Sequence, residues 1–314
     1  VVQTNSYPCQ LNTMCVTMSV SVPVRDFANF AVTLSGFTGA IHADGDIDLF
    51  SSAKNLSDPV LEFQSELGSG SSGTWSNVEK TLKVKATCRL EADTLYAFCF
   101  QVTNPSSPQD PPPLYIENDI VQKLSITKSH MPEPSLLPYQ GSAPDTQALY
   151  VRRSELLTFG VKSNSTQICH PNKLTFDFSV NLPMDSNCRI KNAVISGITG
   201  LSVDAGEIQI LKESASAGAF RDTATWDPAS GLLSLTLIAG SAIEAGSDVV
   251  FSVVMKNGEV AQLGPDLTLE IDDTDDMDAT WDHMLSKPLT IHESATLTAG
   301  IEQSMSWPQA TNML

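Results

Sequence analysis

The sequence contains six blocks that occur twice in the same order, and this repeat constrains the fold more than any other feature. The clearest pair is VTLSGFTGA at 32–40 and AVISGITGL at 193–201. Chance does not produce six ordered matches, so we expect one kind of domain to be formed twice. The other pairs are NTMCVTMSVSVPV (12–24) with NKLTFDFSVNLPM (172–184), ADGDIDLF (43–50) with DAGEIQIL (204–211), GTWSNVEKTLKVKAT (73–87) with ATWDPASGLLSLTLI (224–238), EADTLYAFCFQVTN (91–104) with EAGSDVVFSVVMKN (244–257), and PLYIEN (113–118) with LTLEID (267–272).

A second comparison sets the limits of the repeated unit. The segment ALYVRRSELLTFGVKSNS (148–165) resembles PLTIHESATLTAGIEQS (288–304), so Val1 corresponds to Val161 and Val161 to Ile301. This predicts a first domain over 1–160, a second over 161–300, and a final segment, 301–314, that resembles the opening of a third copy. Either the array continues, or this terminal strand belongs with a neighbouring molecule.

The blocks predict strands. Leu174, Phe176, Phe178 and Val180 alternate with polar residues at a period of two, which is the pattern of a half-buried strand. Glycine, asparagine and aspartate turn signals separate such runs, and no helical stripe longer than about ten residues occurs. Short strands joined by turns predict an all-β fold, specifically two tandem Ig-like antiparallel β-sandwiches.

The repeated phrase itself predicts a strand that runs into a corner. Gly36 and Gly197 follow the strand residues and are expected to adopt backbone angles that a side chain disfavours. A ligand loop is the alternative interpretation of this phrase.

Composition excludes several classes of protein. The formal net charge is −18, which argues against a nucleic-acid partner because phosphate binding needs clustered Lys and Arg. No apolar run approaches the length of a membrane span, and no signal peptide is visible. The sequence opens at Val1 without Met, so we expect a processed or partial product.

The six cysteines predict disulfides and an oxidising compartment, because each predicted domain holds an even number of them. In the second domain an internal bridge requires Cys169–Cys188. In the first, three pairings satisfy Cys9, Cys15, Cys88 and Cys99, and the sequence does not choose between them. We favour Cys9–Cys88 with Cys15–Cys99, because Cys15 and Cys99 occupy outward positions of alternating strands.

Proline predicts an extended strap within the first domain, over 104–144. Nine of the eighteen prolines fall there, and consecutive prolines favour polyproline II. A long surface loop is the simpler interpretation. The second hypothesis, which applies if the source is an alga or a plant-like protist, is O-glycosylation of hydroxyproline at Pro108, Pro111, Pro112 and Pro113.

Two triplets match the acceptor pattern for N-glycosylation: Asn55-Leu56-Ser57 and Asn164-Ser165-Thr166. Both lie in polar stretches, so we predict that Asn55 and Asn164 are accessible acceptors in a secreted protein.

Two acidic runs offer hard oxygen ligands of the kind that calcium prefers. The first holds Asp44, Asp46 and Asp48, and neither run completes an EF-hand loop. A solvated acidic loop is the simpler interpretation. If calcium binds, the better candidate is the second run, which holds Asp272, Asp273, Asp275, Asp276 and Asp278.

The sequence offers no recognisable catalytic motif. It contains no H-E-x-x-H, no G-x-S-x-G and no P-loop, and no Ser/His/Asp set recurs in both copies. Trp75 and Trp226 are equivalent residues, and we interpret them as core residues of a sandwich rather than as an exposed platform for sugar. We therefore expect neither an enzyme nor a bound cofactor.

The layout N-x-L-T-F-x-F-S-V-x-L-P, followed by A-V-I-S-G-I-T-G, A-T-W and L-x-L-T-L, resembles tandem Ig-like repeats in large secreted proteins of microalgae and other protists. These include the fibre-forming proteins of flagellar hairs, called mastigonemes. The resemblance covers both copies and rests on structural motifs. It implies extracellular, glycosylated modules that build filaments or coats without catalysis, although such proteins are usually much longer.

These features together predict an extracellular structural glycoprotein that assembles head to tail into a homopolymer. The alternative is an adhesin or carbohydrate-binding ectodomain, assisted by calcium. The terminal segment is the expected assembly junction, through Ile301, Met305, Trp307, Met313 and Leu314.

Overall fold

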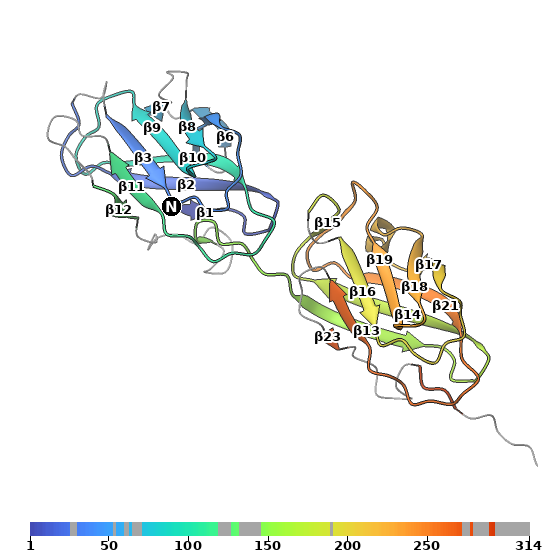
Figure 1. The fold of residues 1–314 in the computed structure, drawn as a ribbon. Helices are drawn as coiled ribbons and strands as arrows, with labels where there is room; N and C mark the ends of the chain where they lie inside the picture. Colours follow the sequence, from blue (N-terminus) through green and yellow to red (C-terminus); the bar gives the residue numbers. More distant parts are fainter. Residues whose placement is uncertain are drawn as a thin grey trace, which may run out of the picture.

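The chain folds into two β-sandwiches that lie end to end (Figure 1). We call them unit 1, up to residue 151, and unit 2, from residue 156. The computed structural model describes residues 1–25, 30–52, 55–59, 63–64, 71–118, 127–131, 146–188, 191–271, 277–278 and 289–292. None of the helices in this described part is long and apolar enough to cross a membrane.

Unit 1 consists of two antiparallel sheets, ordered β1-β2-β10-β5-β6 and β12-β11-β3-β9-β8-β4, with β7 paired to β9. Its strands are β1 (Val2–Gln3), β2 (Leu11–Ser19), β3 (Ala31–Ser35), β4 (Gly45–Asp48), β5 (Phe50–Ser52), β6 (Asn55–Pro59), β7 (Phe63–Gln64), β8 (Ser72–Ser76), β9 (Thr81–Ala86), β10 (Leu95–Thr103), β11 (Tyr115–Asn118) and β12 (Ser129–His130).

Unit 2 forms one continuous path, β13-β14-β21-β17-β18-β19-β16-β22-β23, with a separate pair, β15-β20, and a short 3-10 helix at Ser216–Ala219. Its strands are β13 (Leu156–Ser163), β14 (Pro171–Val180), β15 (Met184–Asp185), β16 (Asn192–Ser196), β17 (Gly206–Lys212), β18 (Thr223–Asp227), β19 (Leu232–Thr236), β20 (Ala242–Ile243), β21 (Val249–Lys256), β22 (Thr268–Ile271) and β23 (Met277–Asp278).

The two units share one topology. In unit 2, β17 belongs to both layers, because its first half pairs with β18 and its second half with β21. In unit 1 two strands divide these roles: β4 pairs with β8, and β5 pairs with β10. The orders β11-β3-β9-β8-β4 and β22-β16-β19-β18-β17 then correspond strand for strand. The predicted fold class, tandem all-β sandwiches of antiparallel strands, is confirmed.

Each unit has its own apolar core between its sheets, as the period-two pattern requires. In β14 the side chains of Leu174, Phe176 and Phe178 are fully buried, and in β9 those of Leu82 and Val84 are. One cluster of buried residues runs from Met14 to Leu149 and the other from Leu156 to Leu289. The predicted boundary between 160 and 161 therefore falls inside β13, because Leu156 and Phe159 already pack in the second core.

The repeated glycines form the predicted corners. Gly36 has φ +95° and Gly197 has φ +81°, in the region that residues with a Cβ rarely adopt. Both also lie against backbone. A Cβ on Gly36 would be 2.3 Å from the carbonyl oxygen of Pro113, and one on Gly197 would be 2.1 Å from that of Asp266. Each of these two positions therefore requires glycine for two reasons: the positive φ and the lack of space for a Cβ.

Candidate functional site: the junction between the units

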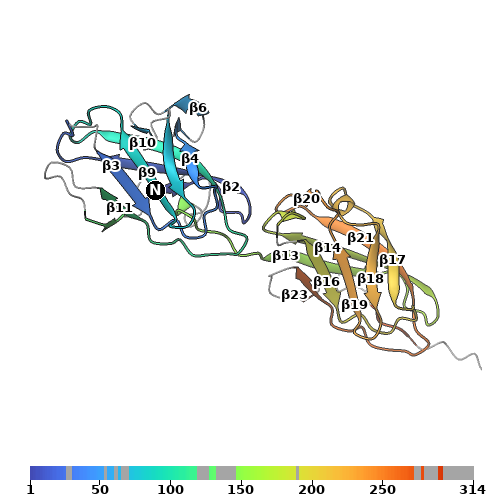
Figure 2. The ribbon, with the colours of Figure 1, turned by 45° about the horizontal axis from the view of Figure 1, so that its top comes forward.

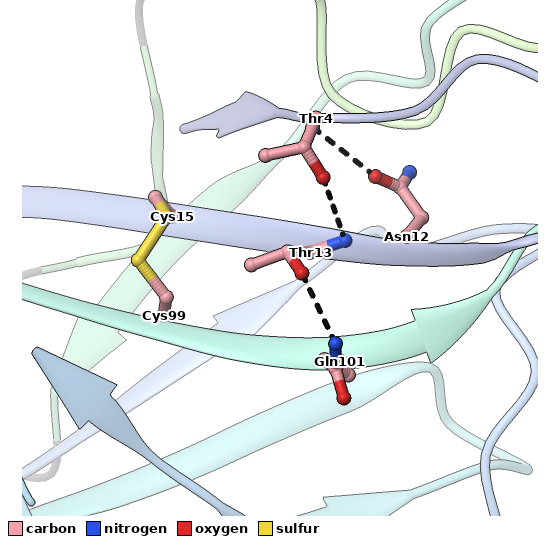
Figure 3. The surroundings of a disulfide bond; sticks show 6 residues. All are labelled: Thr4, Asn12, Thr13, Cys15, Cys99 and Gln101. Atoms are coloured by element: carbon pink, nitrogen blue, oxygen red, sulfur yellow. Dashed lines mark hydrogen bonds between the residues drawn. A yellow bond between two sulfur atoms is a disulfide. The ribbon is translucent and has the colours of Figure 1, made fainter. Parts of the chain in front are cut away.

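A cross-strand disulfide lies on the outer face of unit 1, where it was predicted. Cys15 of β2 and Cys99 of β10 are directly opposed in register, with Cα atoms 4.1 Å apart (Figure 3). The equivalent opposed pair in unit 2 is Thr175 and Ser252, whose hydroxyls are 2.8 Å apart. One position of the repeat therefore carries a covalent link in unit 1 and a hydrogen bond in unit 2.

The second disulfide joins the two units: Cys9 of unit 1 bonds Cys188 of unit 2, with Cα atoms 5.9 Å apart. The predicted pairings Cys9–Cys88 and Cys169–Cys188 are therefore wrong. They assumed that an even number of cysteines in each domain means internal bridges. The end-to-end contact instead brings Cys9 close to the neighbouring domain, within bridging distance of Cys188.

Cys9 belongs to a loop, residues 4–10, that we call the junction loop. Two fully buried asparagines hold it in place. The Nδ2 of Asn104 donates to the carbonyl oxygens of Asn5 and Tyr7, at 3.0 and 2.9 Å. The Oδ1 of Asn104 accepts from Nδ2 of Asn12 at 2.8 Å. The Oδ1 of Asn12 accepts from the backbone N–H groups of Thr4 and Asn5, and Figure 3 shows the first of these two bonds.

The junction loop also makes the apolar contact between the units. The ring of Tyr7 packs against the hydrophobic core of unit 2. The guanidinium carbon of Arg152 lies 6.0 Å from the centre of the same ring, and the Arg152 N–H donates to the carbonyl oxygen of Ser6 at 2.9 Å. Aromatic burial and a cation over the ring stabilise one arrangement of the loop and the linker.

The linker between the units, residues 152–155, is short, and hydrogen bonds also hold its C-terminal end against unit 2. Asn181 of unit 2 accepts from the Glu155 N–H at 2.8 Å, and its own Nδ2 donates to the carbonyl oxygen of Arg153 at 3.1 Å. A disulfide, a packed tyrosine and a hydrogen-bonded linker therefore connect the same two ends. Such a junction restricts bending far more than a flexible linker would.

The far end of unit 2 repeats the construction of this junction loop. We call residues 164–170 the end loop. Asn257 donates to the carbonyl oxygens of Ser165 and Gln167 at 3.2 and 2.8 Å, and accepts from Asn172 at 2.9 Å. The N–H of His292 donates to the carbonyl oxygen of Thr166 at 2.9 Å. These contacts correspond to those of Asn104, Asn12 and Arg152 around the junction loop.

Of the predicted glycosylation sites, Asn164 lies directly after β13 and is exposed. Its Oδ1 accepts from the Lys173 N–H at 2.6 Å. Asn55 is the first residue of β6, and its side chain lies outside the described residues. The two sequons therefore differ in setting: one is at a strand end, the other within a strand.

Of the proline strap, the structure describes residues 104–118 and 127–131, and Pro108, Pro111, Pro112 and Pro113 fall within the first stretch. Pro113 is exposed, while the other three are half-buried. The strap crosses the end of unit 1, where Gln109 donates to the carbonyl oxygens of Thr38 and Leu149 at 3.1 and 2.7 Å. Gln262 makes the matching bonds in unit 2, to Thr199 and Leu289, so the strap is a built part of the repeat.

The acidic residues proposed for calcium lie largely beyond what the structure describes. Asp272, Asp273, Asp275 and Asp276 are outside the described residues, and Asp278 is in β23 with its side chain outside them. Among the described residues, no three His, Cys, Asp or Glu side chains gather in a metal-binding arrangement. The assembly residues Ile301, Met305, Trp307, Met313 and Leu314 also lie outside the described part of the chain.

The equivalent tryptophans are core residues. Trp75 is 1% exposed and Trp226 is 2% exposed, and Nε1 of Trp226 donates to the carbonyl oxygen of Val203 at 3.2 Å. Neither ring presents a face for stacking on a sugar.

The sequence prediction missed the paired asparagines, although a signal for them exists. Asn12 and Asn172 open equivalent blocks, and Asn104 and Asn257 close equivalent blocks. A polar residue kept at the same strand end in both copies indicates a buried hydrogen-bonding role, because asparagine is otherwise unfavourable in a strand.

Replacing both Cys9 and Cys188 with serine is expected to loosen the junction. The loop-entropy model assigns about 5 kcal/mol to a cross-link between residues so far apart in sequence. The expected result is faster cleavage by trypsin at Arg152 and Arg153 in the linker, measured by gel and mass spectrometry. The matched control is the C15S/C99S variant, which removes a disulfide within unit 1 and should leave linker cleavage unchanged. Equal cleavage of wild type and C9S/C188S would contradict a junction held by this bond.

One exposed ion pair gives unit 2 a pH dependence. The Lys173 ammonium, through its hydrogen bond to the carboxylate, and then the Ser252 hydroxyl lower the pKa of Glu213 below 4.5. A lowered pKa contributes stability that is present above the unfolded-state value and is lost as pH falls through the folded-state value. We expect the Glu213→Gln variant to have a slightly lower Tm at neutral pH. The difference should shrink as pH falls from about 4.5 and vanish once pH is below the lowered folded-state pKa of Glu213. A difference that grows in acid would contradict this.

Comparisons with known proteins give distant similarities to solved structures alone. No family model matches the sequence, and no curated protein matches it. Solved structures to which the chain is distantly similar include the major pilin SpaA of Corynebacterium diphtheriae, at 9% identity and a TM-score of 0.29, covering 89% of this chain and 66% of that one. Collagen adhesin from S. aureus has 8% identity and a TM-score of 0.22, with 88% of each chain covered. BcpA, the major pilin subunit of Bacillus cereus, has 9% identity and a TM-score of 0.26, covering 85% and 69%.

The fold and the junction together define the class of this protein: two tandem Ig-like β-sandwiches fastened end to end by a disulfide, a packed tyrosine and a bonded linker. Figure 2 shows the same end-to-end arrangement from a second direction. The fold class rests on the strand order and the two cores of this chain.

Proposed function

We propose that this chain is an extracellular structural glycoprotein, a repeating subunit that assembles head to tail into a filament or surface appendage. The observation that carries the proposal is the repeated end. The end loop of unit 2 has the same asparagine clamp and the same backbone bond as the junction loop of unit 1. A surface that already joins one sandwich to the next is therefore presented again at the far end of the molecule, where a further sandwich fits.

Two disulfides support an extracellular location. Cys9–Cys188 and Cys15–Cys99 are both formed in the fold, and such bonds persist mainly in oxidising compartments. The exposed asparagine of the second sequon fits the same location. Function in this proposal is mechanical, and neither the fold nor the junction requires a catalytic group.

An open strand edge supports the terminal segment as part of the contact. Within the described part of the chain, no strand pairs with Val16–Ser19 of β2 on the side away from β10. The equivalent edge of β14, Phe176–Ser179, is covered by β13. The segment 288–304 resembles 148–165, which includes the whole of β13. We propose that the C-terminal segment of one copy adds a strand to this edge of the next copy.

Negative-stain microscopy of the purified chain tests the proposal. We expect filaments whose axial repeat corresponds to two sandwiches. We expect their loss when 296–314 is deleted, because this removes the segment equivalent to β13 together with the residues that follow it. Single particles at all concentrations would contradict the function. Filaments that survive the deletion would contradict this junction alone. Binding of the monomer to a glycan array, lost in EDTA, would instead favour an adhesin.

Glycosylation at Asn164 is a separate prediction. The exposed side chain at a strand end is open to the enzyme that attaches the sugar, so the chain secreted from a eukaryotic host is expected to carry a glycan there. The Asn164→Gln variant should migrate faster on a gel by one glycan, and treatment with an N-glycosidase should remove the difference. Identical migration of wild type and variant before treatment would show that the site is empty. Asn55→Gln serves as the comparison for the other sequon.

A further inference from the structure

Two cysteines remain as thiols in the folded chain. The structure describes all six cysteines, and Cys88 and Cys169 are the two that form no disulfide. Both are exposed. Exposed thiols in a protein that forms two other disulfides need a partner if the compartment is oxidising.

Cys169 has the same backbone conformation and the same backbone hydrogen bond as Cys9. The two residues are equivalent in the repeat, and both have a left-handed backbone, with φ of 57° for Cys9 and 58° for Cys169. Their N–H groups donate to equivalent carbonyl oxygens, of Pro105 and of Gly258, each at 3.1 Å. The asparagine clamp described above holds each loop. Cys9 forms a disulfide with the sandwich that follows it in the chain. Cys169 occupies the equivalent position at the far end of unit 2, from which a disulfide to a further sandwich can form.

Cys88 lies at the end of unit 1 that corresponds to the Cys188 end of unit 2. In unit 2, β15 pairs with β20 through Met184 and Ile243, and Ser186, two residues before Cys188, accepts from Gly240 and donates to Ser241. The matching bridge in unit 1 joins Val24 to Leu90. Cys88 precedes Leu90 by two residues, just as Ser241 precedes Ile243. Cys88 therefore lies at the same end of its unit as Cys188 does, in the loop that precedes Leu90. This loop neighbours the loop of unit 1 that is equivalent to the Cys188 loop.

The two thiols lie at opposite ends of the molecule. The loops of Cys9 and Cys169 precede the long strands β2 and β14, whereas Cys88 and Cys188 lie beyond the far ends of those strands. Each long strand spans about 30 Å. The Cys9–Cys188 bond places the other two cysteines at the outer ends, so they cannot reach each other within one copy.

We propose that Cys169 of one copy forms a disulfide with Cys88 of the next copy, so that the assembled filament is covalently linked from end to end. This inference rests on the head-to-tail function proposed above and identifies the partner as a second copy of this chain. The bond repeats, between chains, the link that Cys9 and Cys188 make within one chain.

The chemistry requires a disulfide oxidant such as glutathione disulfide. The thiolate of Cys169 attacks one sulfur of the oxidant, forms a mixed disulfide and releases one glutathione thiol. The thiolate of Cys88 from the neighbouring copy then attacks the protein sulfur and releases the second glutathione thiol. Each cysteine gives up one proton, the two cysteines lose two electrons, and the oxidant gains them.

The test uses the full chain, incubated with glutathione disulfide and separated on a non-reducing denaturing gel. Wild type is expected to form a ladder of covalent multimers that collapses to monomer on reduction. Cys88→Ser and Cys169→Ser alone should each lower the multimers at least tenfold. An equal mixture of the two variants should give a covalent dimer and nothing larger, with Cys88 and Cys169 found in one linked peptide pair. Both positions are exposed, so the variants should keep the wild-type Tm.

Two results would overturn the inference. One is a wild-type chain that stays monomeric on the gel, with both thiols open to alkylation. The other is a covalent dimer in either single variant, which would mean that like ends pair. Microscopy of the same samples separates this failure from failure of the proposed function. Filaments without a ladder would reject the disulfide and keep the function, whereas a ladder without filaments would keep the disulfide and reject the filament.

Discussion

The Gly197→Ala variant is expected to lose about 3–5 kcal/mol of the free energy of unfolding of unit 2. Two effects add. The residue has φ +81°, where a side chain is strained, and the new Cβ would lie 2.1 Å from the carbonyl oxygen of Asp266. That oxygen is backbone next to β22, which pairs with β16, so it cannot move without disturbing the sheet. Urea unfolding followed by circular dichroism measures the loss, and hydrogen exchange assigns it to unit 2.

The matched control is Gly240→Ala. Gly240 also has φ +81°, but no atom lies within 4 Å of the position its Cβ would take. This variant therefore measures the backbone strain alone, about 1–2 kcal/mol. A loss for Gly197→Ala no larger than that for Gly240→Ala would show that the corner yields and that the close approach does not require glycine.

The Asn257→Ala variant is expected to destabilise unit 2 by about 3–5 kcal/mol and to release the end loop. Asn257 is fully buried and satisfies the carbonyl oxygens of Ser165 and Gln167 as well as the amide of Asn172. Alanine leaves these groups without the bonds they had, in a place that water does not reach. Urea unfolding measures the loss, and faster hydrogen exchange over 164–170 reports the loop.

Two further variants sharpen this result. Asn104→Ala removes the equivalent clamp from unit 1 and should destabilise that unit to a similar extent while freeing the junction loop. Asn187→Ala changes an exposed asparagine and should alter stability by less than about 0.5 kcal/mol. If Asn257→Ala changed the free energy of unfolding as little as Asn187→Ala, the buried amide would contribute nothing to stability. The interpretation that Asn257 holds the end loop in place would then be wrong.

The two units share one fold although their cysteines occupy different positions. The outer-face pair is a disulfide in unit 1 and a threonine–serine hydrogen bond in unit 2. The link across the junction joins two separately folded cores. In the proposed filament the same kind of link continues between chains through the remaining two thiols.

The sequence by itself determined the fold class, the repeat and the corners. Alternation in β14 and β9 assigned the buried faces, because side chains of a strand point alternately to opposite sides. The glycine phrase identified the left-handed corners for the same local reason, and the outward positions of Cys15 and Cys99 favoured a bond between them, which the structure contains. Each of these follows from residues close in sequence or from paired strands of one sandwich.

Only the tertiary structure decided the partner of Cys9 and the role of the buried asparagines. Cys9 and Cys188 are 179 residues apart, and no local pattern states which loop of the second sandwich faces the first. A disulfide forms where two Cα atoms come within about 7 Å, and that proximity is set by the packing of Tyr7 and by the bonded linker. Pairing across the junction is a property of how whole domains meet, which counting cysteines within each domain cannot predict.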